Sequence, residues 1–354
     1  MKNFVRTQGN RLVVGDANDE LHLRGVAIYK SDRPEPSPQD YEELASLHVN
    51  TIRLTFSYHH FYNEDTPEVY KEEAWRWIDA HVTLAHQYQM RLILQNCGVE
   101  GAQFVPIADL PFDYTIWVNT ELQNRFINLW RAIAERYQNE PQIVGFSLFY
   151  EPVVLQTKEQ WRDLAQRTIN AIREVDQNHI VFVERVYGEN AVRREVSNVE
   201  LTPEEAFVSV QDDKVIYEFY FFERDEFTHQ FAPWRTDVQT ARIYPDEQWQ
   251  IYYRERSGLE RYLPFNRDYL KFYLDRQREF GRAQNTPMAI WAFGALKSCY
   301  TENRGGLQWL KDVLELFNQQ GVHWTLWGYY DDDFGIHANE AAKAILKSAL
   351  ENSA

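Results

Sequence analysis

The sequence predicts an α/β fold, a single closed (β/α)8 barrel of the TIM type. Eight short apolar segments alternate with amphipathic segments along the chain, and such alternation indicates a parallel sheet covered by helices. The length of 354 residues suits a barrel of this kind. A doubly wound open sheet is the alternative, but it requires a glycine-rich phosphate loop after the first strand, and Gly25-Val26-Ala27-Ile28 is not such a loop.

The chain begins with sequence typical of a β-hairpin, from Phe4 to Val14 with a turn at Gln8-Gly9-Asn10. The first barrel strand is expected over Leu21–Val26. The first helix opens at Ser37-Pro38-Gln39-Asp40, where a serine cap precedes a proline at the first helical position and an acid in the first turn. This helix should run to about Leu47.

The rest of the chain repeats this alternation. Short runs of apolar residues predict seven more strands, over Thr51–Phe56, Arg91–Asn96, Ile143–Phe149, Ile180–Glu184, Val215–Phe221, Met288–Phe293 and His323–Trp327. Helical patterns lie over Glu72–Tyr88, Glu121–Tyr137, Lys158–Val175, Asn266–Gln284, Leu307–Gln320 and Asn339–Leu350. We therefore expect one domain over residues 1–354, with an N-terminal hairpin at 1–20 and a long loop over the barrel mouth, after strand six, at 223–265.

Composition excludes several classes of partner. A formal net charge of -16 argues against nucleic acid and anionic membranes, and no apolar run approaches the roughly 18 residues of a membrane span. Two cysteines cannot build a disulfide framework, and the opening Met-Lys-Asn-Phe-Val does not resemble a signal peptide. The expectation is a cytoplasmic monomer that uses no cofactor and no metal.

The residues at the strand ends carry the chemical information. The fourth strand runs into Tyr150-Glu151-Pro152, the sixth ends Tyr220-Phe221-Phe222, the seventh reads Trp291-Ala292-Phe293-Gly294, and the eighth ends at Trp327. Together with Leu23-Arg24-Gly25-Val26 on strand one and Arg53 on strand two, these motifs resemble glycoside hydrolase family 5, the cellulase-type barrels of clan A. The resemblance covers nearly the whole chain, and the family it points to is often secreted.

The resemblance implies roles for three residues. Arg53 matches the arginine of the family's second strand, Glu151 matches its acid/base, and Trp327 matches its strand-eight tryptophan. Five other positions depart from the family pattern. Tyr150 replaces the asparagine that holds the sugar 2-hydroxyl, Tyr220 and Phe222 replace a histidine and a tyrosine, Cys97 (or Asn96 in a shifted register) replaces a histidine, and Ala292 replaces the nucleophilic glutamate.

Ordinary retaining hydrolysis needs two carboxylates about 5–5.5 Å apart, and Ala292 can supply none. Three origins of the altered site remain open. Engineering could have kept the scaffold and rebuilt the pocket, natural divergence could have produced a pseudoenzyme, or one substitution could be a deliberate knockout.

The leading hypothesis is that Glu151 acts as a general base. A lone carboxylate among aromatic residues is desolvated, which raises its pKa and makes it a stronger base. This predicts proton abstraction from a planar aromatic substrate, an elimination of the Kemp type. The substrate would stack between aromatic walls, with Gln95 or Arg53 stabilising an anion; the walls would be Tyr150, Tyr220, Phe222 and Trp327.

Several alternatives stay open beside it. The chain could be an inactivated endoglucanase-type glycosidase, or a pseudoenzyme that binds oligosaccharide through Trp327 and Trp234. A thiol ester hydrolase would use Cys97 with His59 or His60. Glu151 could be paired with Arg53 and do nothing else, and Glu184 is either a second acid or a polar rim residue. Lys30 and the run Asp331-Asp332-Asp333 are expected to be solvated.

Overall fold

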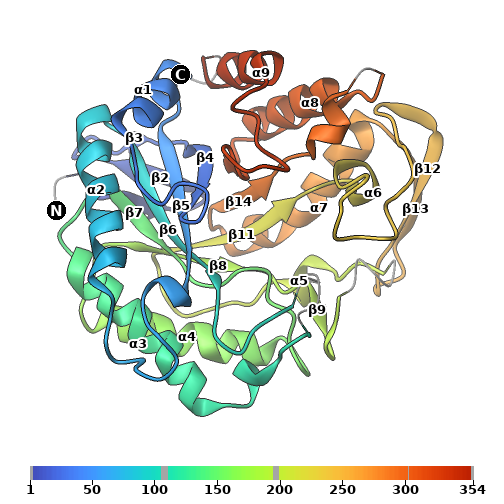
Figure 1. Ribbon diagram of the computed structural model, residues 1–354. Helices are drawn as coiled ribbons and strands as arrows, with labels where there is room; N and C mark the ends of the chain where they lie inside the picture. The colour runs from blue at the N-terminus through green and yellow to red at the C-terminus, as the bar shows by residue number, and fades with distance from the viewer. Residues whose placement is uncertain (1–2, 105–110, 194–198, 302, 352–354) are drawn as a thin grey trace.

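The computed structural model describes residues 3–104, 111–193, 199–301 and 303–351, and its centre is a closed barrel of eight parallel strands (Figure 1). Going round the barrel, the strands follow one another in chain order and the last pairs with the first, which confirms the predicted (β/α)8 fold. They are β4 (Arg24–Tyr29), β5 (Thr51–Ser57), β6 (Arg91–Gly98), β7 (Ile143–Ser147), β8 (Ile180–Glu184), β11 (Val215–Phe221), β14 (Met288–Phe293) and β15 (His323–Leu326).

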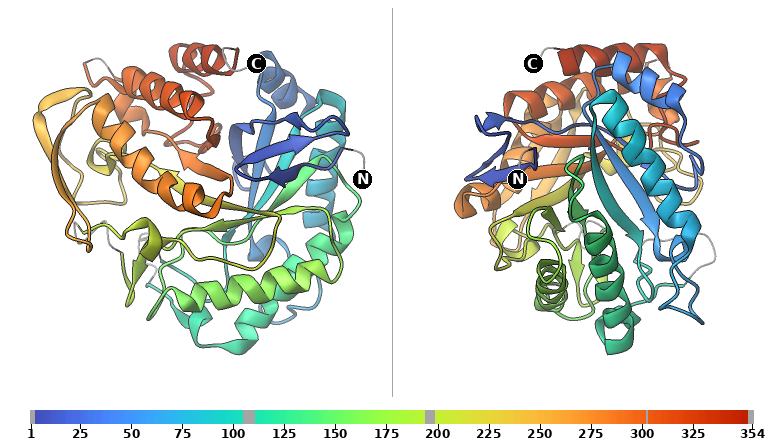
Figure 2. Two further views of the ribbon diagram at one scale, coloured as in Figure 1. Left: turned by 180° about the vertical axis from the view of Figure 1, so that it is seen from behind. Right: turned by 90° about the vertical axis from the view of Figure 1, so that its left-hand side faces the viewer.

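Helices cover the outside of this barrel, as the two further views in Figure 2 show. The long ones are α1 (Pro38–Ser46), α2 (Glu72–Tyr88), α3 (Thr120–Tyr137), α4 (Glu159–Arg173), α7 (Arg267–Gln284), α8 (Gly306–Gln319) and α9 (Glu340–Glu351). The predicted cap of α1 is confirmed, because the Ser37 side chain accepts a hydrogen bond of 3.1 Å from the Asp40 N–H. The Asn266 side chain caps α7 in the same way.

Five barrel strands differ from their predicted bounds by one to three residues, and two of them do so for evident local reasons. The first begins three residues later than predicted, at Arg24, because the Leu21 N–H donates to Leu12 of the N-terminal sheet instead. That sheet contains the predicted hairpin, β1 (Arg6–Gln8) and β2 (Arg11–Val14), and adds β3 (Asp19–Glu20). Strand β7 ends at Ser147 instead of Phe149, just before the backbone turns at Glu151.

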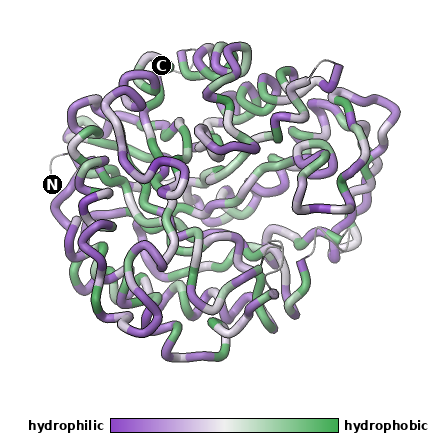
Figure 3. The backbone as a smooth tube through the Cα atoms, viewed as in Figure 1, coloured by the Kyte–Doolittle hydropathy of each residue, from purple (hydrophilic) through white to green (hydrophobic). Residues whose placement is uncertain are grey.

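The barrel interior is layered. Apolar side chains, among them Leu23, Ile93 and Phe182, pack with Val5 and Leu12 of the N-terminal sheet, which closes the amino-terminal end of the barrel. Figure 3 shows apolar residues concentrated on the central strands and hydrophilic residues more frequent on the surrounding helices and loops. Nearer the mouth the interior becomes polar, and its buried members are Arg53, Gln95, Ser147, Glu184, Glu218 and Thr325.

The segment after strand six is more ordered than the expected loop. It contains a short helix, α6 (Asp225–Thr228), and an antiparallel hairpin made of β12 (Asp246–Arg254) and β13 (Glu260–Phe265). The hairpin lies at the right-hand edge of Figure 1, beside α7. Within the described ranges, no helix combines the length and the apolar character that crossing a membrane requires.

Candidate active site at the barrel mouth

Glu151 lies at the mouth, four residues after the end of β7, with 7% of its surface exposed. Its φ of 44° is left-handed, a conformation that is uncommon for a residue other than glycine. The turn is fixed by a hydrogen bond of 2.9 Å from the Glu151 backbone N–H to Oε2 of Glu184 at the end of β8. A buried carboxylate on the neighbouring strand therefore holds the backbone of the expected acid/base.

The Glu151 carboxylate is paired with an arginine that the sequence analysis did not single out. Nη2 of Arg193, on β10 (Val192–Arg193), lies 3.3 Å from Glu151 Oε2 and 3.4 Å from the Tyr220 hydroxyl. The expectation of a lone carboxylate among aromatic rings is therefore wrong. A cation at this distance favours the charged carboxylate, which opposes the effect of desolvation.

Arg53 forms its ion pair deeper in the barrel, so the suggestion that Glu151 is paired with Arg53 is also wrong. Arg53 Nη2 donates to Glu218 Oε2 at 2.9 Å, and Arg53 Nε donates to the Thr325 hydroxyl at 3.1 Å. Both members of the Arg53–Glu218 pair are wholly buried, and Ser147 donates to the other oxygen of Glu218. Burial raises the pKa of Glu218, while Arg53 and Ser147 oppose that rise.

Glu184 is fully buried and is not a rim residue. Trp291 Nε1 donates to one of its oxygens, and the Glu151 backbone N–H donates to the other. Burial, followed by the negative charges of Glu218 and Glu151, raises the pKa of Glu184 well above its ordinary value. Two adjacent strands thus place Glu184 and Glu218 side by side beneath Glu151.

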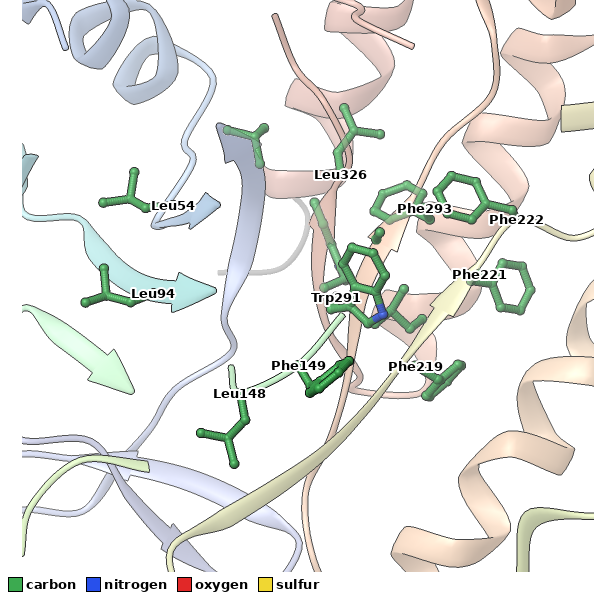
Figure 4. Packing of buried hydrophobic residues seen from close by; sticks show 14 of the residues in the cluster. Leu54, Leu94, Leu148, Phe149, Phe219, Phe221, Phe222, Trp291, Phe293 and Leu326 are labelled. Carbon is green, nitrogen blue, oxygen red and sulfur yellow. The ribbon is translucent and has the colours of Figure 1, made fainter. Parts of the chain in front are cut away.

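The end of β14 contains a feature that the sequence did not reveal. Phe219 of β11 pairs with Ile290, and the next residue, Tyr220, pairs with Ala292, so Trp291 is an extra residue in β14. Such a β-bulge redirects side chains locally. Trp291 lies among the barrel strands in Figure 4, whereas Phe221 points away from β11 on the other side.

The indole of Trp291 is buried among the aromatic residues at the mouth. Its ring lies 5.2 Å from that of Tyr150, 5.6 Å from Trp327 and 6.5 Å from Tyr220. Ala292 beside it has no exposed surface. Trp291 and its neighbours therefore cover Ala292, and its side chain has no surface open to a ligand.

Comparison with known proteins decides the family. The model of the cellulase family, glycosyl hydrolase family 5, matches residues 14–333. The chain belongs to glycosyl hydrolase family 5. Its relatives include endoglucanase C of Acetivibrio thermocellus, 25% identical over 329 residues that make up 88% of this chain and 89% of that protein.

Two further proteins are similar to this chain, one in sequence and one in fold. Cellodextrinase A of Ruminococcus flavefaciens is 24% identical over 80% of this chain and 75% of its own. The crystal structure of endoglucanase Cel5A from Thermotoga maritima superposes with a TM-score of 0.70 at 18% identity, over 92% of this chain and 96% of that one. At this identity, the similarity to the Cel5A structure supports the fold alone.

A second set of aromatic residues lies at the mouth around Tyr220. Tyr220 stacks on Tyr187 with ring centroids 4.1 Å apart, and the Tyr187 hydroxyl accepts the Tyr220 N–H. Phe222 lies 5.5 Å from Tyr220 and 5.2 Å from His229, so it joins this set to the loop after strand six. Tyr150, Tyr220 and Trp327 stay partly exposed.

Two predicted residues stand apart from this chemistry. Gln95 is fully buried, and neither its amide nitrogen nor its amide oxygen has a hydrogen-bond partner in the described part of the chain. The Cys97 thiol donates to the Phe56 carbonyl at 3.1 Å, and burial raises its pKa to about 12. His60 does not activate this thiol, since its Nδ1 accepts the Ser57 N–H.

Polar residues at the rim have local partners. Lys30 lies over the ring of Trp77 at 5.2 Å, and Asp331 Oδ1 accepts the N–H groups of Asp333 and Phe334, as a turn requires. Trp234 contacts Phe334. Among the residues that the structure describes, no three His, Cys, Asp or Glu side chains are grouped to hold a metal ion.

Proposed function

We propose that this family 5 barrel binds a short neutral oligosaccharide at its mouth and does not cleave it by the retaining mechanism. The observation that carries the proposal is that position 292 is fully buried, beside the buried indole of Trp291, under the partly exposed rings of Tyr150 and Trp327. The related Thermotoga maritima Cel5A was crystallised with cellobiose and with mannotriose, and these sugars are the ligand class that we expect.

The buried carboxylates do not replace the missing nucleophile. Each oxygen of Glu184 accepts an N–H, from Trp291 and from the Glu151 backbone. Each oxygen of Glu218 is likewise taken, by Arg53 and by Ser147. Neither carboxylate has exposed surface, so neither can attack a sugar or activate water in the way that hydrolysis requires.

The mouth supplies what a binding site needs. Binding sites combine aromatic and apolar surface with a few placed polar groups. Tyr150, Tyr220 and Trp327 provide partly exposed rings, and the Glu151–Arg193 pair provides donors and acceptors between them.

Calorimetry with cellotetraose tests this proposal. We expect the wild type to bind cellotetraose with measurable heat, and Trp327→Ala to bind it with at least tenfold lower affinity. Trp249 is a partly exposed tryptophan on β12, and Trp249→Ala should leave the affinity unchanged. Cellotetraose should remain intact after prolonged incubation. No heat at millimolar sugar, or product release that disappears in Glu151→Gln, overturns the proposal.

A second candidate is general-base chemistry by Glu151 on a planar aromatic substrate, and the aromatic rings beside this carboxylate favour it. Arg193 weakens the base by stabilising its charge, so removing that cation should strengthen it. In a benzisoxazole ring-opening assay, Arg193→Met should be faster than the wild type and Glu151→Gln inactive. An unchanged rate in Glu151→Gln excludes this candidate.

A further inference from the structure

The β12–β13 hairpin has one face buried and one face open. Side chains alternate along a strand, so Ile251 and Tyr253 share one face while Tyr252 belongs to the other. Ile251 and Tyr253 are 4% and 3% exposed, and the Tyr253 ring packs on Phe272 of α7. The inner face therefore anchors the hairpin to the barrel, and the outer face is left to solvent.

Two tyrosines stand at the centre of the outer face. Tyr252 and Tyr262 are cross-strand partners, and their rings stack with centroids 4.8 Å apart and 26° between planes. Tyr252 is 36% exposed and Tyr262 is 68% exposed. By contrast, the exposed Trp234 rests on the buried ring of Phe334. The two tyrosine rings therefore form one stacked aromatic surface that stays open to solvent, and such a surface can contact a partner.

Polar groups flank the tyrosines on the same face. Gln250 pairs with Pro264 on one side, and Arg254 pairs with Glu260 on the other. Arg254 Nε lies 3.5 Å from Glu260 Oε1, so this row of side chains has no net charge. On the outer face of the hairpin, the two tyrosine rings thus lie between side chains that can donate and accept hydrogen bonds.

The net charge of the chain favours some binding partners for this face over others. The whole chain carries a net charge of -16, so a second copy or any acidic polymer would be repelled as it approached. A neutral sugar polymer meets no such repulsion. Its hydroxyl groups match the amide, guanidinium and carboxylate, and its C–H faces match the tyrosine rings.

We propose that the outer face of the β12–β13 hairpin is a second glycan-binding site, which holds a neutral β-linked glucan chain. The hairpin lies outside α7 at the edge of the molecule (Figure 1), so this site is separate from the barrel mouth. It would keep the chain on an insoluble polysaccharide while the mouth binds a chain end or a short fragment.

Retention on amorphous cellulose tests the site. Tyr252→Ala/Tyr262→Ala should lower the association constant by roughly tenfold, because both stacking rings are lost. Tyr252→Phe/Tyr262→Phe keeps the rings and should bind as the wild type does. Thermal unfolding checks that the alanine variant is folded, which the buried Ile251 and Tyr253 of the inner face should ensure.

The outcomes separate this site from the mouth. Both proposals stand if Trp327→Ala no longer binds soluble cellotetraose but is still retained on cellulose, and if that retention depends on Tyr252 and Tyr262. Tyrosine-dependent retention without any cellotetraose binding supports the hairpin site and overturns only the proposal for the mouth. Equal retention of the wild type and the alanine variant overturns the hairpin site, as does a dimer in sedimentation that the alanine substitutions abolish.

Discussion

Arg53→Met tests the buried ion pair that the family's strand-two arginine forms in this barrel. Arg53 and Glu218 are 1% and 0% exposed, and their charged atoms are 2.9 Å apart. At an effective dielectric constant of about 20 this attraction is about 6 kcal/mol, of which desolvation offsets a part. Breaking such a pair leaves an uncompensated buried charge, so we expect a loss of about 3–5 kcal/mol in the free energy of unfolding.

The same substitution at the surface is the matched control. Arg136 and Asp79 are also paired, at 2.6 Å, but their side chains are 42% and 44% exposed. Exposed pairs contribute about 0–1 kcal/mol, so Arg136→Met should cost little. Arg53→Met/Glu218→Gln removes both charges and should recover most of the loss that Arg53→Met causes. Urea unfolding at 25 °C measures all three.

The pH dependence gives an independent check on the charge of Glu218. Burial already raises the pKa of Glu218, and Arg53→Met removes the group that opposes the rise. The unfolded chain releases this proton near pH 4, whereas the folded variant keeps it to higher pH. The variant's free energy of unfolding should therefore fall as pH rises through that window, by up to about 1.4 kcal/mol per unit. The reasoning is refuted if Arg53→Met costs no more than Arg136→Met, or costs the same at pH 5 and pH 7.

Three further predictions concern single side chains. Ala292→Glu alone should not release product from cellotetraose, because position 292 is fully buried beside Trp291; product above the wild-type level contradicts this. Burial raises the pKa of Glu223 to about 8, so the folded chain holds a proton at pH 7 that the unfolded chain has lost, and stability should fall from about pH 5 to pH 8. Urea unfolding should show a shallower fall in Glu223→Gln, and an equal slope would refute the assignment. The pKa of about 12 keeps the Cys97 thiol protonated, so mass spectrometry should find no acyl adduct there after an activated ester at pH 7.

The fold could be predicted because each of its signals is local. Apolar runs and caps such as Ser37-Pro38 depend on neighbouring residues, and the structure reproduces most of their bounds. The family also followed from short motifs at strand ends. The errors in strand bounds were of one to three residues, and at the start of the first strand the cause is a backbone group with a partner in another sheet, since Leu21 donates to Leu12.

The site could be predicted only in part because its partners come from distant segments. Arg193 reaches Glu151 from a two-residue strand with no apolar pattern, so no sequence signal pointed to it. Glu218 could have been noticed as an acid within an apolar strand, two residues before Tyr220. Its pairing with Arg53 depends on the directions of two side chains across the barrel, which spacing along the chain does not give.

The bulge at Trp291 makes the seventh strand one residue longer than its pairing with β11 requires. A substitution changes the side chain at a position but leaves this surplus of backbone in place. The backbone of the seventh strand, as well as its side chains, therefore decides which residue stands opposite Tyr220, and a new side chain at position 292 would take its place in this register.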